Sequence, residues 1–219
     1  MPRAEWFRRT SWSPADQADF LAHLGRCRSG SSKAQYLRIQ AYHLQATRDT
    51  SMILASLGLL DQVLREYPES SELATVYFQQ GDCLTMLGRD GEAIESLRRS
   101  IEMQRRRPSV RNSAHLAFGE LVVRLRLREL YAEVLRDLDD LGDLDDLPIE
   151  QYRQQVIRAS ILDESGRLDE ARQAAAQALK ASEQTQSPYR NHPKIGLVGS
   201  PDRRVQEWLA AIVSRGGRA

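Results

Sequence analysis

A stretch in the middle of the chain recurs near its end, and this repetition constrains the fold more than any other feature of the sequence. Residues 81–101, GDCLTMLGRDGEAIESLRRSI, align without a gap with residues 159–179, ASILDESGRLDEARQAAAQAL, 78 positions later. The glycine of the polar turn coincides (Gly88 and Gly166), and so does the alanine that follows it (Ala93 and Ala171). Self-similarity at a period of about 20–50 residues is typical of solenoids, which stack one small unit repeatedly.

Two weaker copies, residues 41–61 and 119–139, indicate that the period is half of that offset. In all four copies the first position is small: Ala41, Gly81, Gly119 and Ala159, at intervals of 40, 38 and 40 residues. Each period has room for two amphipathic helices joined by a short turn. Neither helix buries its apolar stripe alone, so each pair must stack on the next. A small residue is expected where two such helices cross closely.

The rest of the sequence is consistent with an all-α fold. Helical periodicity runs from about residue 14 to residue 181, and no segment has the pattern of a strand bounded by turns. Ala, Leu, Glu, Arg and Gln, which are strong helix formers, are abundant. The chain is 41% hydrophobic with a formal net charge of +1, as in an ordinary globular protein.

The repeated positions resemble the tetratricopeptide repeat, in particular Gly81, Leu84, Gly88, Ala93, Leu97 and Pro108. The resemblance implies a right-handed α-α superhelix of four helix pairs, residues 34–73, 74–111, 112–151 and 152–186. It is most specific in the second and fourth pairs. It is weakest in the third, where Tyr131 replaces the small residue and Arg126–Glu129 replaces the glycine-containing turn.

The flanks are predicted to cap this array. Residues 1–33 contain a helix from about Pro14 to Arg28, with Ser13 as its N-cap, and residues 187–219 contain a helix from about Asp202 to Val213. Between the fourth pair and the last helix lies a Pro- and Gly-rich loop, residues 184–201. Two interpretations of this loop stay open: it crosses the stack, or it folds into the groove with Tyr189, His192 and Ile195.

The sequence offers no signature of catalysis. The four histidines lack metal-ligand spacing, and the phosphate-binding, dinucleotide-binding and nucleophile-elbow motifs are absent. We therefore expect no enzyme activity, no cofactor and no metal. Cys27 and Cys83 lack CxxC spacing and are expected to be reduced thiols. No apolar run predicts a membrane span or a secretory signal, which favours a cytoplasmic protein, and the excess of Arg over Lys suggests a GC-rich bacterial genome.

The resemblance implies a non-enzymatic module that binds a peptide or partner protein in a concave groove lined by the first helix of each pair, as a scaffold, a regulator or an immunity or inhibitor partner. Transferred column by column, the groove residues are Arg38, Tyr42, Gln45, Phe78, Asp82, Met86, Glu120, Arg124, Arg153 and Asp163. The Lys and Asn columns that clamp a C-terminal carboxylate in the family's best-known groove carry instead Phe78, Asp82, Leu116, Glu120, Val156 and Ser160. A chaperone-tail adaptor is therefore disfavoured.

Charge is segregated along the chain. Residues 98–128 contain nine Arg and two Glu, whereas residues 129–150 contain nine acidic residues and one Arg. Charges on outer helices and helix ends explain these strips simply. They also suggest a homo-oligomer in which the basic strip of one copy meets the acidic strip of another. The alternative function is nucleic-acid binding through the Arg-rich strip 98–128 and the N-terminal EWFRRTSW. The near-neutral net charge and the adjacent acidic strip, which would repel phosphates, argue against it.

Overall fold

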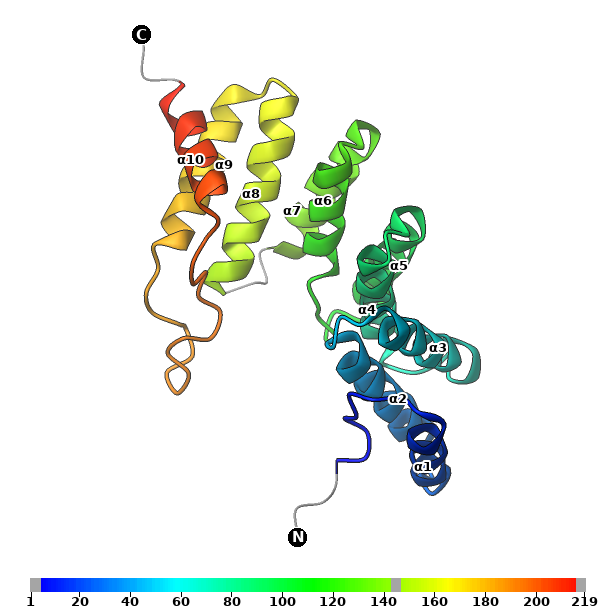
Figure 1. Cartoon of the computed structure of the whole chain (residues 1–219). Coiled ribbons are helices and arrows are strands. Elements are labelled where there is room, and N and C mark those ends of the chain that lie inside the picture. The colour runs from blue at the N-terminus through cyan, green and yellow to red at the C-terminus, as the bar shows by residue number, and fades with distance from the viewer. Residues whose placement is uncertain (1–4, 143–146, 216–219) are drawn as a thin grey trace. The chain divides into compact units, whose positions relative to one another are not determined.

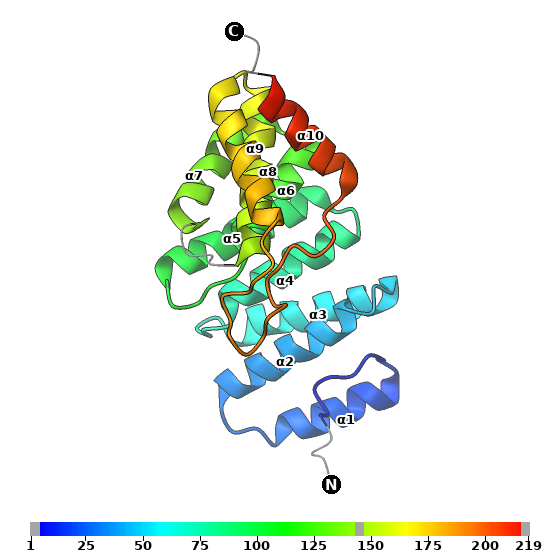
Figure 2. The ribbon, with the colours of Figure 1, turned by 90° about the vertical axis from the view of Figure 1, so that its left-hand side faces the viewer.

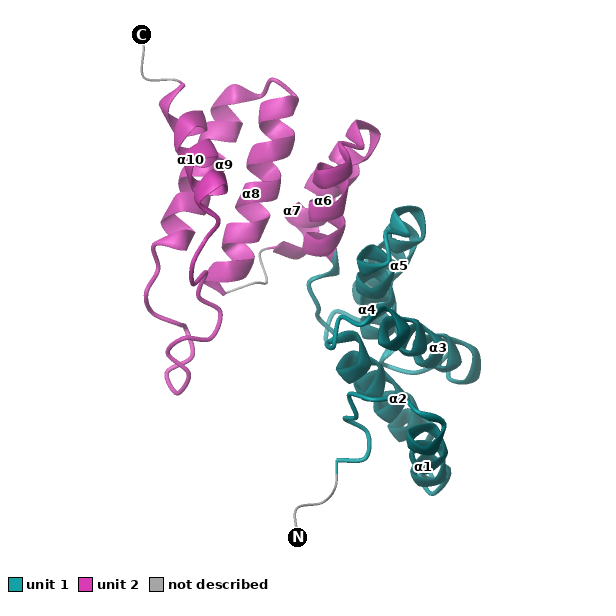
Figure 3. Cartoon of the chain, viewed as in Figure 1, with its two compact units in different colours: residues 1–114 teal, residues 115–219 magenta. Residues whose placement is uncertain are grey.

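The computed structural model describes residues 5–142 and 147–215, and within these ranges it contains ten α helices, one short 3₁₀ helix and no strand. The all-α prediction is confirmed. The chain divides into two compact units, unit 1 (residues 1–114) and unit 2 (residues 115–219), shown in different colours in Figure 3. Each unit contains two helix pairs and a flanking helix.

Unit 1 begins with the flanking helix α1 (Pro14–Gly25) and continues with the two pairs α2 (Gly30–Gln45) with α3 (Thr50–Glu66) and α4 (Leu73–Met86) with α5 (Asp90–Arg106). Within each pair the helices pack against each other, and α3 packs against α4, so the two pairs are stacked (Figure 1). The predicted cap of α1 is confirmed, because the Ser13 side chain accepts from the backbone N–H of Asp16 while Asp16 accepts from the backbone N–H of Ser13. The helix ends at Gly25, three residues before its predicted end.

Unit 2 contains α6 (Ala114–Leu125) followed by a 3₁₀ turn (Arg128–Leu130) and α7 (Tyr131–Leu141), then the pair α8 (Pro148–Glu164) and α9 (Leu168–Ser182). The last helix, α10 (Arg203–Ser214), packs against α9 and α8, as the two views in Figures 1 and 2 agree. Residues of the weakly matching third pair thus form two helices, α6 and α7, and the boundaries predicted for this pair stay a prediction. The right-handed superhelix predicted for the whole array stays a prediction.

All four turns within the helix pairs place one residue in the left-handed region. These residues are Arg48 (φ 60°), Gly88 (71°), Arg126 (54°) and Gly166 (73°), spaced like the small residues and seven positions after them. In the last three turns the next residue's N–H donates back to a carbonyl five positions earlier, for example Arg89 N to Leu84 O at 2.9 Å. This is the Schellman arrangement that closes a helix C-terminus.

The non-glycine residue in the third turn leads to a stability prediction. A left-handed conformation costs an L-residue with a side chain about 1–2 kcal/mol. We expect Arg126→Gly to raise the free energy of unfolding by about 0.5–1 kcal/mol and Gly166→Ala to lower it by about 1 kcal/mol. Urea unfolding followed by circular dichroism measures both. Two shifts of the same sign would contradict the role of this position.

Contacts of the small residues also agree with their predicted purpose. A methyl group at Gly81 would lie 2.7 Å from Leu97 Cγ, which is closer than side-chain carbons approach one another. At Gly119 it would lie 3.0–3.1 Å from side-chain atoms of Ile157 and Val134. The glycines thus allow α4 to approach α5, and α6 to approach both α7 and α8.

Polar contacts recur after two repeats rather than one. Arg89 pairs with Glu92 at 2.6–2.7 Å, and 78 residues later Arg167 pairs with Glu170 at 2.5–2.7 Å. A second contact also recurs after 78 residues. Gln80 of α4 donates to Asp61 of α3 at 2.8 Å, and Arg158 of α8 donates to Asp139 of α7 at 2.6 Å. At the corresponding positions of the second and third repeats stand Ile101 and Phe118, which are both buried.

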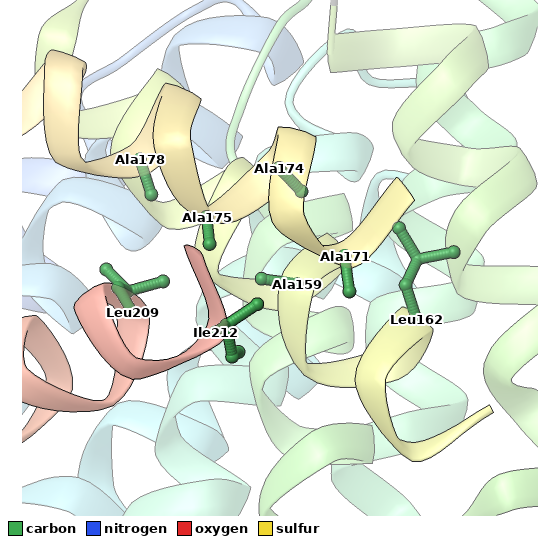
Figure 4. Packing of buried hydrophobic residues seen from close by; sticks show 8 residues of the cluster. All are labelled: Ala159, Leu162, Ala171, Ala174, Ala175, Ala178, Leu209 and Ile212. Atoms are coloured by element: carbon green, nitrogen blue, oxygen red, sulfur yellow. The ribbon is translucent and has the colours of Figure 1, made fainter. Parts of the chain in front are cut away.

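The core of unit 2 around α10 is rich in alanine. Leu209 and Ile212 are buried against six residues of α8 and α9, shown in Figure 4: Ala159, Leu162, Ala171, Ala174, Ala175 and Ala178. Trp208 packs partly buried against the same cluster. The predicted C-terminal capping helix therefore covers the fourth pair.

Candidate functional site

In unit 1, five of the six predicted groove residues are accessible. On α2, Arg38 and Tyr42 are one helical turn apart, and on α4 the same spacing places Phe78, Asp82 and Met86 on one face. Tyr42 and Met86 are 53% and 47% exposed, and Phe78 is partly buried. Arg38 forms an ion pair with Glu72, which precedes α4, so this contact joins the two first helices.

Gln45 does not belong to this surface. Its side chain is only 6% exposed, and its Oε1 has no hydrogen-bond partner among the residues that the structure describes. The three-residue step from Tyr42 turns Gln45 into the interior of unit 1. The column-by-column transfer therefore assigned Gln45 to the groove wrongly.

In unit 2, the predicted groove residues are largely engaged with one another or with α10. Arg153 of α8 forms a two-pronged ion pair with Glu120 of α6, at 2.6 and 2.8 Å. Asp163 at the end of α8 accepts from Arg215, just after α10, at 2.7 Å. Arg124 is exposed on α6. The charges of this surface are thus matched within the unit, whereas the accessible side chains of unit 1 include two large apolar ones.

The loop at residues 184–201 meets the beginning of α8. Ile149 N–H donates to Gly196 O at 2.8 Å, and Gly196, with a φ of 76°, lies so close to Leu147 that a side-chain carbon would overlap it. Tyr189 and Ile195 are about half exposed, and His192 is exposed. The loop is therefore anchored at the N-terminal end of α8, by its backbone.

The charged strips are partly paired inside the protein. In the basic strip, Arg99 pairs with Glu95 at 3.0 Å and lies over the Tyr77 ring, and Arg128 contacts Glu164 at 3.4 Å. In the acidic strip, Asp137 is buried, and Asp143, Asp145 and Asp146 lie outside the described residues. The N-terminal aromatic residues, the second basis of the nucleic-acid alternative, pack against α1 and α2.

The described side chains include no group of three or more His, Cys, Asp or Glu placed to hold a metal ion. Burial raises the pKa of the Cys83 thiol to about 11, so this cysteine is protonated near neutral pH. Among the residues that the structure places, no helix is long and apolar enough to cross a membrane.

Comparison with known families identifies two of the repeats. A tetratricopeptide repeat model matches residues 74–107 and 155–185, which correspond to α4–α5 and to most of α8–α9. No curated protein and no solved structure matches significantly. The chain therefore contains tetratricopeptide repeats at these two places, which are also the two where its sequence resembles the family most specifically. Such repeats generally mediate protein–protein interaction, in proteins that are typically non-enzymatic.

Proposed function

We propose that the protein is a non-enzymatic interaction module whose main recognition surface is the α2–α4 face of unit 1, defined by Arg38, Tyr42, Phe78, Asp82 and Met86. The observation that carries this proposal is the contrast between the two units. Unit 1 presents two large apolar side chains, Tyr42 and Met86, while the equivalent surface of unit 2 presents paired charges.

This surface suits an extended or helical segment of a partner protein. Aromatic and methionine side chains are enriched at the centres of interfaces, where they contribute most of the binding energy. Asp82 and the Arg38–Glu72 pair supply a polar rim that orients the partner. Because the Lys and Asn columns of a carboxylate clamp are absent, we expect this surface to bind internal residues of the partner rather than its C-terminus.

The test is quantitative affinity capture with three forms of the full chain: wild type, the double variant Tyr42→Ala/Met86→Ala, and Leu54→Ala. Leu54 is 52% exposed on α3, so it is a matched control of similar apolar character on a second helix. We expect the double variant to bind its partner with an affinity about 30-fold lower. This change corresponds to the loss of about 2 kcal/mol of binding free energy. Equal retention by all three forms, or equal loss in Leu54→Ala, would contradict the proposal.

A further inference from the structure

The N-terminal segment, residues 5–12, is bound to α1 and α2 through an aromatic box. The Trp6 ring stacks on His23, with centroids 5.2 Å apart and planes inclined by 19°. It also packs against Phe20 at 5.2 Å and Tyr36 at 4.9 Å. Two walls of the box come from α1 and the third from α2, so both helices must be in place before the ring is held.

The backbone of the segment is recognised by one buried amide. Gln40 is fully buried on α2, and its Nε2 donates to Arg9 O at 2.7 Å while its Oε1 accepts from Arg9 N–H at 3.0 Å. Gln40 thereby satisfies both backbone groups of one residue, as a neighbouring strand does in a sheet. This contact requires an extended backbone at the bound residue and does not depend on the identity of its side chain.

An acidic pair recognises the side chain of the same residue. The Arg9 guanidinium donates to Asp16 Oδ1 at 2.8 Å and also pairs with Asp19, both on α1. Both acids are helix residues one turn apart, and Asp16 is also fixed by the α1 cap. The helices therefore supply three separate recognition elements: a ring box, a backbone clamp and a carboxylate pair.

We propose that the α1–α2 surface is a peptide-recognition site, filled in cis by Trp6–Arg9, and that it accepts a partner peptide with an aromatic residue followed three positions later by arginine. A segment that only covers a hydrophobic cap requires apolar contact. This one is held by directional contacts of the kind that distinguish one peptide from another.

The site is separate from the surface of the proposed function. Tyr36 and Gln40 point to one side of α2, whereas Arg38 and Tyr42 lie roughly opposite, given about 100° of rotation per residue. A tethered segment acts at an effective concentration of the order of millimolar. The wild-type chain is therefore self-masked, and a partner peptide binds only by displacing residues 5–12.

The experiment uses the full chain and a fluorescein-labelled peptide of residues 5–12, EWFRRTSW, followed by fluorescence anisotropy. In the variant Trp6→Ala/Arg9→Ala, which weakens the cis segment, we expect saturable binding at least about tenfold tighter than in wild type. Adding Gln40→Ala to that variant should abolish the binding. Adding Leu54→Ala instead, at an exposed position of α3 outside both surfaces, should leave it unchanged.

Circular dichroism establishes that each variant is folded. If the double variant is not, Arg9→Ala alone leaves Trp6 in its box and should bind the peptide with intermediate affinity. A peptide carrying Ala in place of its Trp6 or Arg9 equivalent should not bind. Equal anisotropy responses of wild type and the weakened variant, or binding that is indifferent to Gln40→Ala, would overturn the proposal and leave the segment as a structural cover.

Discussion

Replacing Leu209 by alanine should lower the free energy of unfolding of unit 2 by about 3 kcal/mol. Leu209 is fully buried, and most of its neighbours in the cluster of Figure 4 are alanines of α9. Alanine side chains are too short to move into the space left behind, so the cavity stays open and the loss is in the range typical of rigid sites. Urea unfolding followed by circular dichroism and by Trp208 fluorescence measures the change, because Trp208 packs on the same cluster.

The matched control for this prediction is Val213→Ala on the same helix. Val213 is 39% exposed, so its truncation should change the free energy of unfolding by less than about 0.5 kcal/mol. Similar losses for the two variants would mean that α10 is held by its helical propensity and not by burial against α9.

Glycine-to-alanine changes at positions 81 and 58 should have opposite signs. At Gly81 the new methyl group would lie 2.7 Å from Leu97 Cγ, and Leu97 is only 1% exposed and has no free space to move into. We expect the free energy of unfolding to fall by about 1–3 kcal/mol, as for other overpacked cores. At Gly58, within α3, the new carbon has no neighbour within 4 Å beyond the adjacent residues and the nearby backbone of its own helix, so the better helix former should raise the free energy of unfolding by up to about 1 kcal/mol.

Thermal and urea unfolding of the two variants, beside wild type, measure both signs. Both variants gain the helix propensity of alanine, but only Gly81→Ala adds a methyl group between α4 and α5. The difference between the two variants therefore measures the effect of the close approach of these helices. A stabilised Gly81→Ala variant would show that Leu97 repacks and that the two helices do not need a glycine there.

The repeat architecture was predictable from the sequence because its causes are local and periodic. A small residue is required wherever two helices cross closely, and Gly81 and Gly119 meet that requirement in the structure. Ser13 was likewise predictable as the N-cap of α1, because a proline follows it directly in the sequence, whereas the second bond of the capping box, from Asp16, was not predicted. Each of these features depends on residue types at fixed spacing.

The site was less predictable because it depends on tertiary contacts. Arg48 and Arg126 occupy left-handed positions that only the aligned glycines of the other repeats indicate. The burial of Gln45 follows from how α2 is rotated against its neighbours, which column alignment does not show. The hydrogen bonds between Gln40 and Arg9 join residues 31 positions apart with no repeated equivalent, so no sequence pattern announces them.

The recurrence of polar contacts after 78 residues makes two helix pairs, rather than one, the repeating unit of this sequence. Asp61 with Gln80 joins the two pairs of unit 1, and Asp139 with Arg158 joins the two pairs of unit 2. The same columns of the second and third repeats carry the apolar Ile101 and Phe118. One helix pair alone therefore holds only half of its polar contact, and the smallest segment that contains the contact whole is a double pair.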